Sequence, residues 1–171
     1  VDDRGRKVFV EPAPTGRVPK FEGEAAALHD KLVAELFHVF SDTETPSYLD
    51  AVAQRHLEEA RQAFRQFGLD KSAIVDLEGR VHLFPWCGTA KLDTLRLALR
   101  YGGLTVEHSR VHLSVSHADI ARVTEVLGAL VHTVPPAQAL TFLTDKLRND
   151  KFDSFLPDAL TREAFIHDGL E

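Results

Sequence analysis

Basic side chains at alternate positions of two strand-like segments are the residues of this chain best suited to chemistry. Two occupy the first segment, Arg80 and His82, and three occupy residues 104–115: His108, Arg110 and His112. Because strand side chains alternate between faces, all five share the non-core face if the segments share a sheet. Arg and His suit phosphate contact, and a sheet face is a usual platform for extended single strands. The pattern predicts nucleic-acid binding; a solvated face, or one packed on another domain, is the alternative.

Two further observations bear on this predicted basic face. No Phe or Tyr alternates with its members, which argues against stacking of bases. Three cations of the following helix are expected to extend the same patch: Lys91, Arg96 and Arg100. The sequence therefore favours contacts with phosphate over contacts with bases.

Other chemistry is less well supported by the residue types. Cys87 at a helix N-terminus could act as a nucleophile with a lowered pKa, but no Asn or Asp partner is identifiable. His108 and His112 lie on the opposite strand face from His117, and no HExxH motif or Cys pair accompanies them. The sequence also contains neither GxxxxGK[ST] nor GxGxxG, so neither familiar nucleotide-binding loop is present.

The element that must position the basic residues is a hairpin followed by a helix. Val75, Leu77, Val81 and Leu83 alternate with polar residues and are predicted to lie on one side of a hairpin that turns at Glu78-Gly79. A corner of Trp86, Gly88 and Thr89 then leads into a leucine-striped helix that Thr89 can cap. We expect Trp86 to be largely buried there as a structural anchor of the corner.

The remaining elements follow from apolar periodicity and from Pro and Gly punctuation. An extended arm (residues 1–23) precedes helices over 24–42 and 46–67; after the hairpin and helix, the pattern predicts a strand over 104–115, helices over 119–131 and 135–147, and a docked tail over 148–171. This order predicts an α+β domain with a small, mostly antiparallel sheet packed with several helices.

Composition limits the class of protein. The 171 residues are 44% apolar, enough for the core of one domain, and the net charge of −6 argues against a strongly basic nucleic-acid module. A single Cys favours the reducing cytoplasm, and no run of apolar residues could span a bilayer. The chain has no Met and begins at Val1, which indicates a piece of a longer protein.

Three motifs together resemble a known family. They are Gly5–Phe21 (GRKVFVEPAPTGRVPKF), the corner Leu83–Thr89 (LFPWCGT) with Thr94-Leu95 after it, and the tail Lys151–Leu160 (KFDSFLPDAL). They resemble the C-terminal accessory region of bacterial DEAD/DEAH-box helicases of superfamily 2, in the Lhr-like group. The resemblance covers most of the chain but includes no catalytic signature.

The resemblance implies a non-catalytic accessory domain that guides DNA or RNA, single-stranded by preference, or contacts the motor domains of the same polypeptide. ATP and Mg are then expected in those motor domains and no cofactor in this chain. The alternative is a protein-interaction module that recruits a partner through apolar helical surfaces. A small enzyme that uses Cys87 or histidines ranks last.

Overall fold

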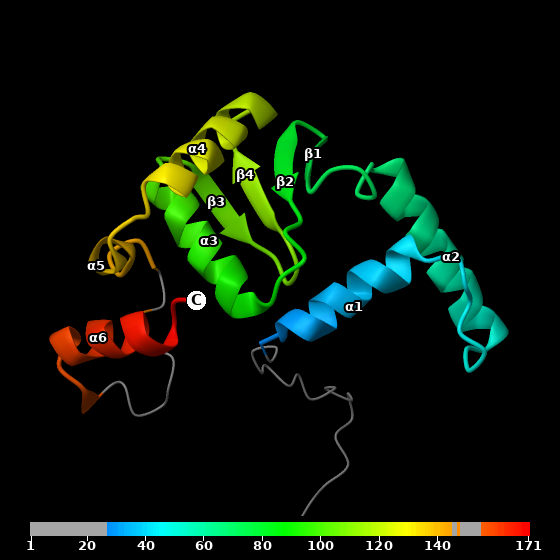
Figure 1. Ribbon diagram of the computed structural model, residues 1–171, viewed down its shortest axis with the longest axis horizontal. Coiled ribbons are helices and arrows are strands. Elements are labelled where there is room, and N and C mark those ends of the chain that lie inside the picture. The colour runs from blue at the N-terminus through cyan, green and yellow to red at the C-terminus, as the bar shows by residue number, and fades with distance from the viewer. Residues whose placement is uncertain (1–26, 145–146, 148–154) are drawn as a thin grey trace, which may run out of the picture.

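Six helices and a four-stranded sheet make up the part of the chain that the computed structural model describes: residues 27–144, 147 and 155–171 (Figure 1). The helices are α1 (Asp30–Ser41), α2 (Ala51–Gln66), α3 (Thr89–Tyr101), α4 (Ile120–His132), α5 (Ala137–Leu140) and α6 (Asp158–Asp168). The strands are β1 (Ile74–Leu77), β2 (Arg80–Leu83), β3 (Thr105–His108) and β4 (Leu113–Ser116). The predicted α+β class is confirmed, whereas the predicted arm (residues 1–23) lies outside the described residues.

The sheet has the strand order β1-β2-β4-β3, and every neighbouring pair is antiparallel. The prediction of a single strand over 104–115 is wrong, because β3 and β4 are separate strands of a hairpin. Its turn is closed by the N–H of Ser109, which donates to the carbonyl of His112 at 2.9 Å. The core positions are therefore even-numbered in β3 and odd-numbered in β4, and one continuous alternation could not describe both.

The β1–β2 hairpin turns at Glu78 and Gly79, both with positive φ (55° and 78°), as a type I′ turn requires. This two-residue turn sets Leu77 opposite Arg80 and Val75 opposite His82. Directly paired residues lie on the same face of a sheet. The prediction that Val75 and Leu77 share a side with Val81 and Leu83 is therefore wrong.

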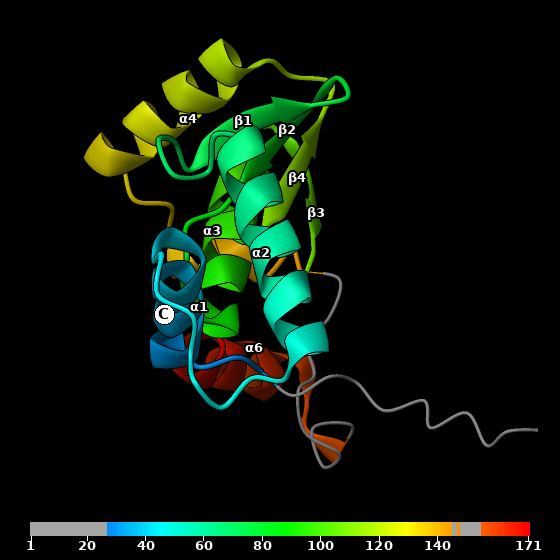
Figure 2. The same ribbon diagram turned by 90° about the vertical axis from the view of Figure 1, so that its right-hand side faces the viewer.

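The inner face of the sheet is the one that α3 and α4 cover. Its core consists of Val and Leu side chains that are almost completely inaccessible: Val81, Leu83, Leu92, Leu99, Leu104, Val106, Leu113, Val115, Val123 and Val126. In Figure 2, where α2 stands in front of the sheet, α4 lies to the left of the strands. We call the opposite surface the outer face.

The α1–α2 pair lies beyond β1 and is fastened by a buried arginine (Figure 1). Arg61 is only 5% exposed, and its guanidinium donates to the carbonyls of Val39 at 2.8 Å and Glu44 at 2.9 Å. The carbonyl of Val39 belongs to the last turn of α1, where no backbone amide is available to it. The Asp50 carboxylate accepts from the N–H groups of Val52 and Ala53, so α2 begins later than the predicted residue 46.

The C-terminal part differs from its prediction in the length of one helix. The helix expected over 135–147 is present only as α5, and turns follow it to Leu143. Arginine side chains bind the carbonyls of these turns: Arg162 donates to Thr141 at 2.9 Å and Arg100 to Leu143 at 3.0 Å. The tail packs through Phe165, which joins Leu97 and Leu140 in a small core, while Phe155 stays 82% exposed.

Candidate nucleic-acid interface

The outer face is built by the strand register. The pairing places Arg80 and His82 of β2 on it, together with the polar residues of the two strands beside them: Ser114 and Ser116 of β4, and Thr105 and Glu107 of β3. Val75 and Leu77 of β1 also face this side and pack into a cluster of aromatic residues. The outer face is therefore apolar along β1 and polar along β4 and β3.

Four rings form a row across the outer face, which we call the ring row: Trp86, Phe84, His112 and His82. The rings of Phe84 and His112 are stacked, with centroids 4.8 Å apart and planes at 22°. The His112 and His82 centroids are 5.3 Å apart, and those of Phe84 and Trp86 are 5.9 Å apart. The prediction that no Phe accompanies the basic residues does not hold in space, because Phe84 lies directly beside His112.

The charges beside the ring row come from two arginines. Arg80 pairs with Glu107 at 3.1 Å, and both side chains are more than half exposed, so the pair holds Arg80 only weakly. Arg110 is exposed in the turn between β3 and β4. The pKa of His112 is lowered, first by burial and then by the neighbouring His82 and His108. His82 is positioned by Ser114, whose hydroxyl oxygen lies 3.1 Å from its Nδ1.

His108 does not lie on the outer face, and this part of the prediction is wrong. It pairs in register with Leu113, a residue of the inner core, and therefore points toward α3. Its Nδ1 lies 3.4 Å from the Oδ1 of Asp93 in α3. The error has the same origin as the single predicted strand, because the β3–β4 turn changes which positions face inward.

The three cations of α3 do not extend the patch, because α3 covers the inner face. Lys91 binds the carboxylate of Asp30 and lies 3.7 Å from Glu171. The side chain of Arg96 is only 13% exposed and lies 3.4 Å from Asp93. Arg100 donates to the carbonyls of Val106 and Leu143. These hydrogen bonds hold β3 and the turn after α5 against α3.

The corner residue Trp86 has most of its surface covered and packs among the rings of three phenylalanines. Its ring centroid lies 5.1 Å from Phe37, 5.8 Å from Phe64 and 6.4 Å from Phe40. Its φ of 53° is unfavourable for a residue with a Cβ atom. The indole N–H is buried without an acceptor among the described residues. Such local costs gather at functional sites, and they single out this corner.

The predicted residues Gly88 and Thr89 have a different role from the expected cap. Gly88 is the N-cap of α3, and its N–H donates at 2.6 Å to Asp30 of α1, 58 positions away in the chain. The N–H of Leu28 donates to the Thr89 hydroxyl, and the N–H of Thr89 donates to the Leu28 carbonyl. We call these bonds the clip. A Cβ atom on Gly88 would lie 2.6 Å from the Leu28 carbonyl oxygen, so only glycine fits.

The environment of Cys87 does not favour a nucleophile. Burial raises the pKa of its thiol, and the negative charge of Asp30 adds to the shift. The expected lowered pKa is therefore wrong, because Asp30 already occupies the N-terminus of α3. Asp30 itself has a lowered pKa, owing to the bonds from Lys91 and Gly88.

Within the described ranges, no three His, Cys, Asp or Glu side chains come together in a way that could hold a metal ion. No helix among those residues has the length and apolar character needed to cross a membrane. Comparisons of the chain with models of protein families, with curated proteins and with solved structures found no match.

Proposed function

We propose that this chain is a non-catalytic accessory domain of an ATP-dependent superfamily 2 helicase, and that its outer face guides single-stranded nucleic acid. The observation that carries the binding role is the ring row flanked by Arg80 and Arg110. The helicase context rests on the resemblance of the three sequence motifs. We also propose a cytoplasmic location, because the chain has a single cysteine.

The aromatic rings and the arginines of the outer face both suit binding of single-stranded nucleic acid. Aromatic rings stack on any base and contribute about 1–3 kcal/mol per base, so they bind without reading the sequence. Arg80 and Arg110 are placed to contact phosphates, which position a strand but carry no base information. Because these cations are few and Arg80 also contacts Glu107, we expect weak binding that falls steeply with salt.

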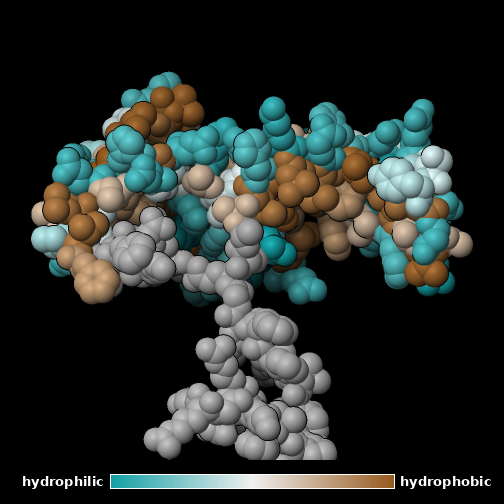
Figure 3. Space-filling model, turned by 90° about the horizontal axis from the view of Figure 1, so that it is seen from below, coloured by the Kyte–Doolittle hydropathy of each residue, from teal (hydrophilic) through white to brown (hydrophobic). Residues whose placement is uncertain are grey.

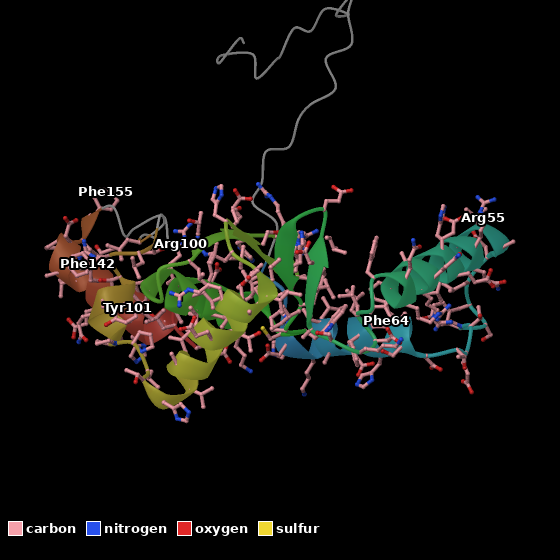
Figure 4. The ribbon with its side chains drawn as sticks, turned by 90° about the horizontal axis from the view of Figure 1, so that it is seen from above. Arg55, Phe64, Arg100, Tyr101, Phe142 and Phe155 are labelled. Carbon is pink, nitrogen blue, oxygen red and sulfur yellow. The ribbon has the colours of Figure 1, made fainter. Side chains whose placement is uncertain are left out.

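The test is a salt titration of oligonucleotide binding to the Arg80→Ala, Arg110→Ala double variant. The log–log slope should fall by about one for each lost phosphate contact, equally for all sequences. Arg55→Ala with Arg122→Ala is the matched control, because it removes the same charge from α2 and α4 (Arg55 is labelled in Figure 4). If both double variants change the slope equally, the outer face has no special role.

A second candidate is docking on a protein, and exposed apolar residues favour it. In Figure 3, hydrophobic residues gather in the middle of the view, over α1, where Leu32 is 57% and Val39 is 38% exposed. Such a patch fits a motor domain of the same polypeptide or a recruited partner. Leu32→Asp with Val39→Asp should then preserve oligonucleotide binding but uncouple ATP hydrolysis from unwinding in the longer protein, or abolish capture of the partner.

A further inference from the structure

A hollow of about 360 Å³ lies between α1 and α2. Three of the residues that line it are aromatic, Phe37, Phe40 and Phe64, and three are polar, Ser41, Arg65 and Asp70. The volume is within the range of small-molecule sites, which are concave, largely apolar and equipped with a few polar groups. The hollow therefore has the general form of a ligand site.

The aromatic walls of the hollow continue into the ring row through Trp86. The Trp86 ring is in contact with all three phenylalanines of the walls and also with Phe84. Phe64, labelled in Figure 4, lies at the end of α2 nearest to the sheet. A strand that stacks on His82, His112 and Phe84 is thus led toward the hollow.

Two exposed charged residues at the hollow are complementary to the polar edge of a nucleobase. Arg65 and Asp70 are both exposed, and neither side chain makes a hydrogen bond or ion pair with another described residue. A guanidinium donates hydrogen bonds to base carbonyls and stacks on flat rings, and a carboxylate accepts from the N–H groups of a base. Flat aromatic walls, a donor and an acceptor together match a nucleobase better than an aliphatic chain.

We propose that this hollow receives one unstacked nucleobase of the single strand that lies along the ring row. The inference rests on the proposed function of the outer face, and it adds a base-binding site to a surface that otherwise contacts phosphates and stacks bases. The strand passes from the ring row past Trp86, and one base turns into the hollow that Phe37, Phe40 and Phe64 line.

The experiment compares two strands of equal length with the full chain. One is an oligothymidylate of about twelve nucleotides, and the other is a deoxyribose–phosphate chain without bases. Affinity is measured by anisotropy of labelled strands, and the emission of Trp86, the only Trp in the chain, reports on the corner. Phe40→Leu removes one ring from the hollow, and Arg65→Ala removes an exposed cation without disturbing the core.

We expect oligothymidylate to bind about tenfold more tightly than the base-free strand and to change the Trp86 emission. Phe40→Leu should remove the part of this difference that the hollow contributes, and Arg65→Ala should remove less of it, while stacking on the ring row keeps the remainder. Phe40→Leu should not alter binding of the base-free strand, and Arg65→Ala should weaken it only as far as the loss of one charge requires. Arg55→Ala is the matched control for Arg65→Ala, because both lie on α2 and only Arg65 lines the hollow.

Three results would overturn the inference. If Phe40→Leu and Arg65→Ala bind oligothymidylate like the unaltered chain, the strand binds at the outer face alone and the proposed function stands without this site. If neither strand binds, the proposed function itself fails. If N-acetylphenylalaninamide changes the Trp86 emission saturably and oligothymidylate does not, the hollow belongs to an aromatic side chain of a protein partner.

Discussion

The two faces of the sheet are packed by different kinds of side chain. On the inner face, the buried core is entirely Leu and Val, and no member is more than 7% exposed. On the outer face, the cluster is largely aromatic, and only Phe64, Leu69 and Val75 are buried. The remaining members keep part of their surface accessible: Phe37, Phe40, Leu77, Phe84 and Trp86.

This difference separates stability from binding. Branched aliphatic side chains fill a closed interior efficiently, and each buried one adds to the free energy of unfolding. Aromatic rings with open faces contribute less to a sealed core but can stack on a ligand. Replacements on the inner face should therefore act on stability, and replacements on the outer face should act on binding.

The largest effect is expected from Leu99→Ala, because Leu99 is 0% exposed in the inner core. It should lower the free energy of unfolding by about 2–5 kcal/mol, measured by urea denaturation. The matched outer-face change is Phe84→Leu, which keeps most of the volume and should cost less than about 1.5 kcal/mol while weakening oligonucleotide binding. Equal destabilisation by both changes would break the contrast between the faces.

Trp86 offers a test in which glycine should be the better replacement. Trp86→Ala should lower the free energy of unfolding by about 3 kcal/mol, at the lower end of the range because part of the side chain stays accessible. Trp86→Gly removes the same contacts but tolerates the φ of 53°, so it should be more stable than Trp86→Ala by about 1 kcal/mol. The reverse order in thermal denaturation would show that the corner relaxes when the indole is lost.

The lowered pKa of His112 predicts a dependence of stability on pH. As pH falls below the ordinary value of 6.5, the unfolded chain takes up this proton before the folded protein does, so stability falls until the folded-state pKa is passed. Repulsion between the charge on His112 and the neighbouring His82 and His108 adds to this cost. His112→Gln should flatten the decline between neutral and mildly acidic pH, as measured by urea denaturation.

The smallest effect is expected from Glu107→Gln, which removes the carboxylate beside Arg80. Oligonucleotide binding should strengthen a few-fold, because the Glu107 carboxylate no longer competes with phosphate for Arg80. Glu125→Gln is the matched control, since it breaks a similar exposed pair with Arg122 on α4 and changes net charge equally. Equal gains in both variants would mean that total charge, and not the outer face, governs binding.

The sequence predicted those parts of the fold that depend on local periodicity. A few neighbouring positions determine the apolar faces of α1, α2, α3 and α4 and the two-residue turn at Glu78-Gly79. The prediction was wrong where a turn exchanges the inward-facing positions from even-numbered to odd-numbered residues, as between His108 and Leu113. Alternation alone does not show which face each strand presents. The prediction also overextended α5, because the carbonyls of the turns that follow α5 accept hydrogen bonds from arginines distant in the chain.

The candidate site was predicted in part for the same reason. Arg80 and His82 follow simple alternation and lie where expected, and His112 joins them from the turn. Phe84 was missed because it looked like part of the corner and not like the next position of its strand face. The partners of Arg61 and Asp30 lie in other elements, and no short-range pattern predicts such contacts.

The clip has a mechanical consequence if the chain works beside a motor domain, as we propose. A pull on the backbone ahead of Leu28 is opposed first by its two hydrogen bonds to Thr89 and by the bond from Gly88 to Asp30. These bonds lead directly into α3, whose leucines are held in the inner core, before the pull reaches the end of α1. Tension would therefore pass along the inner side of the sheet and leave the aromatic outer side, the proposed binding surface, unloaded.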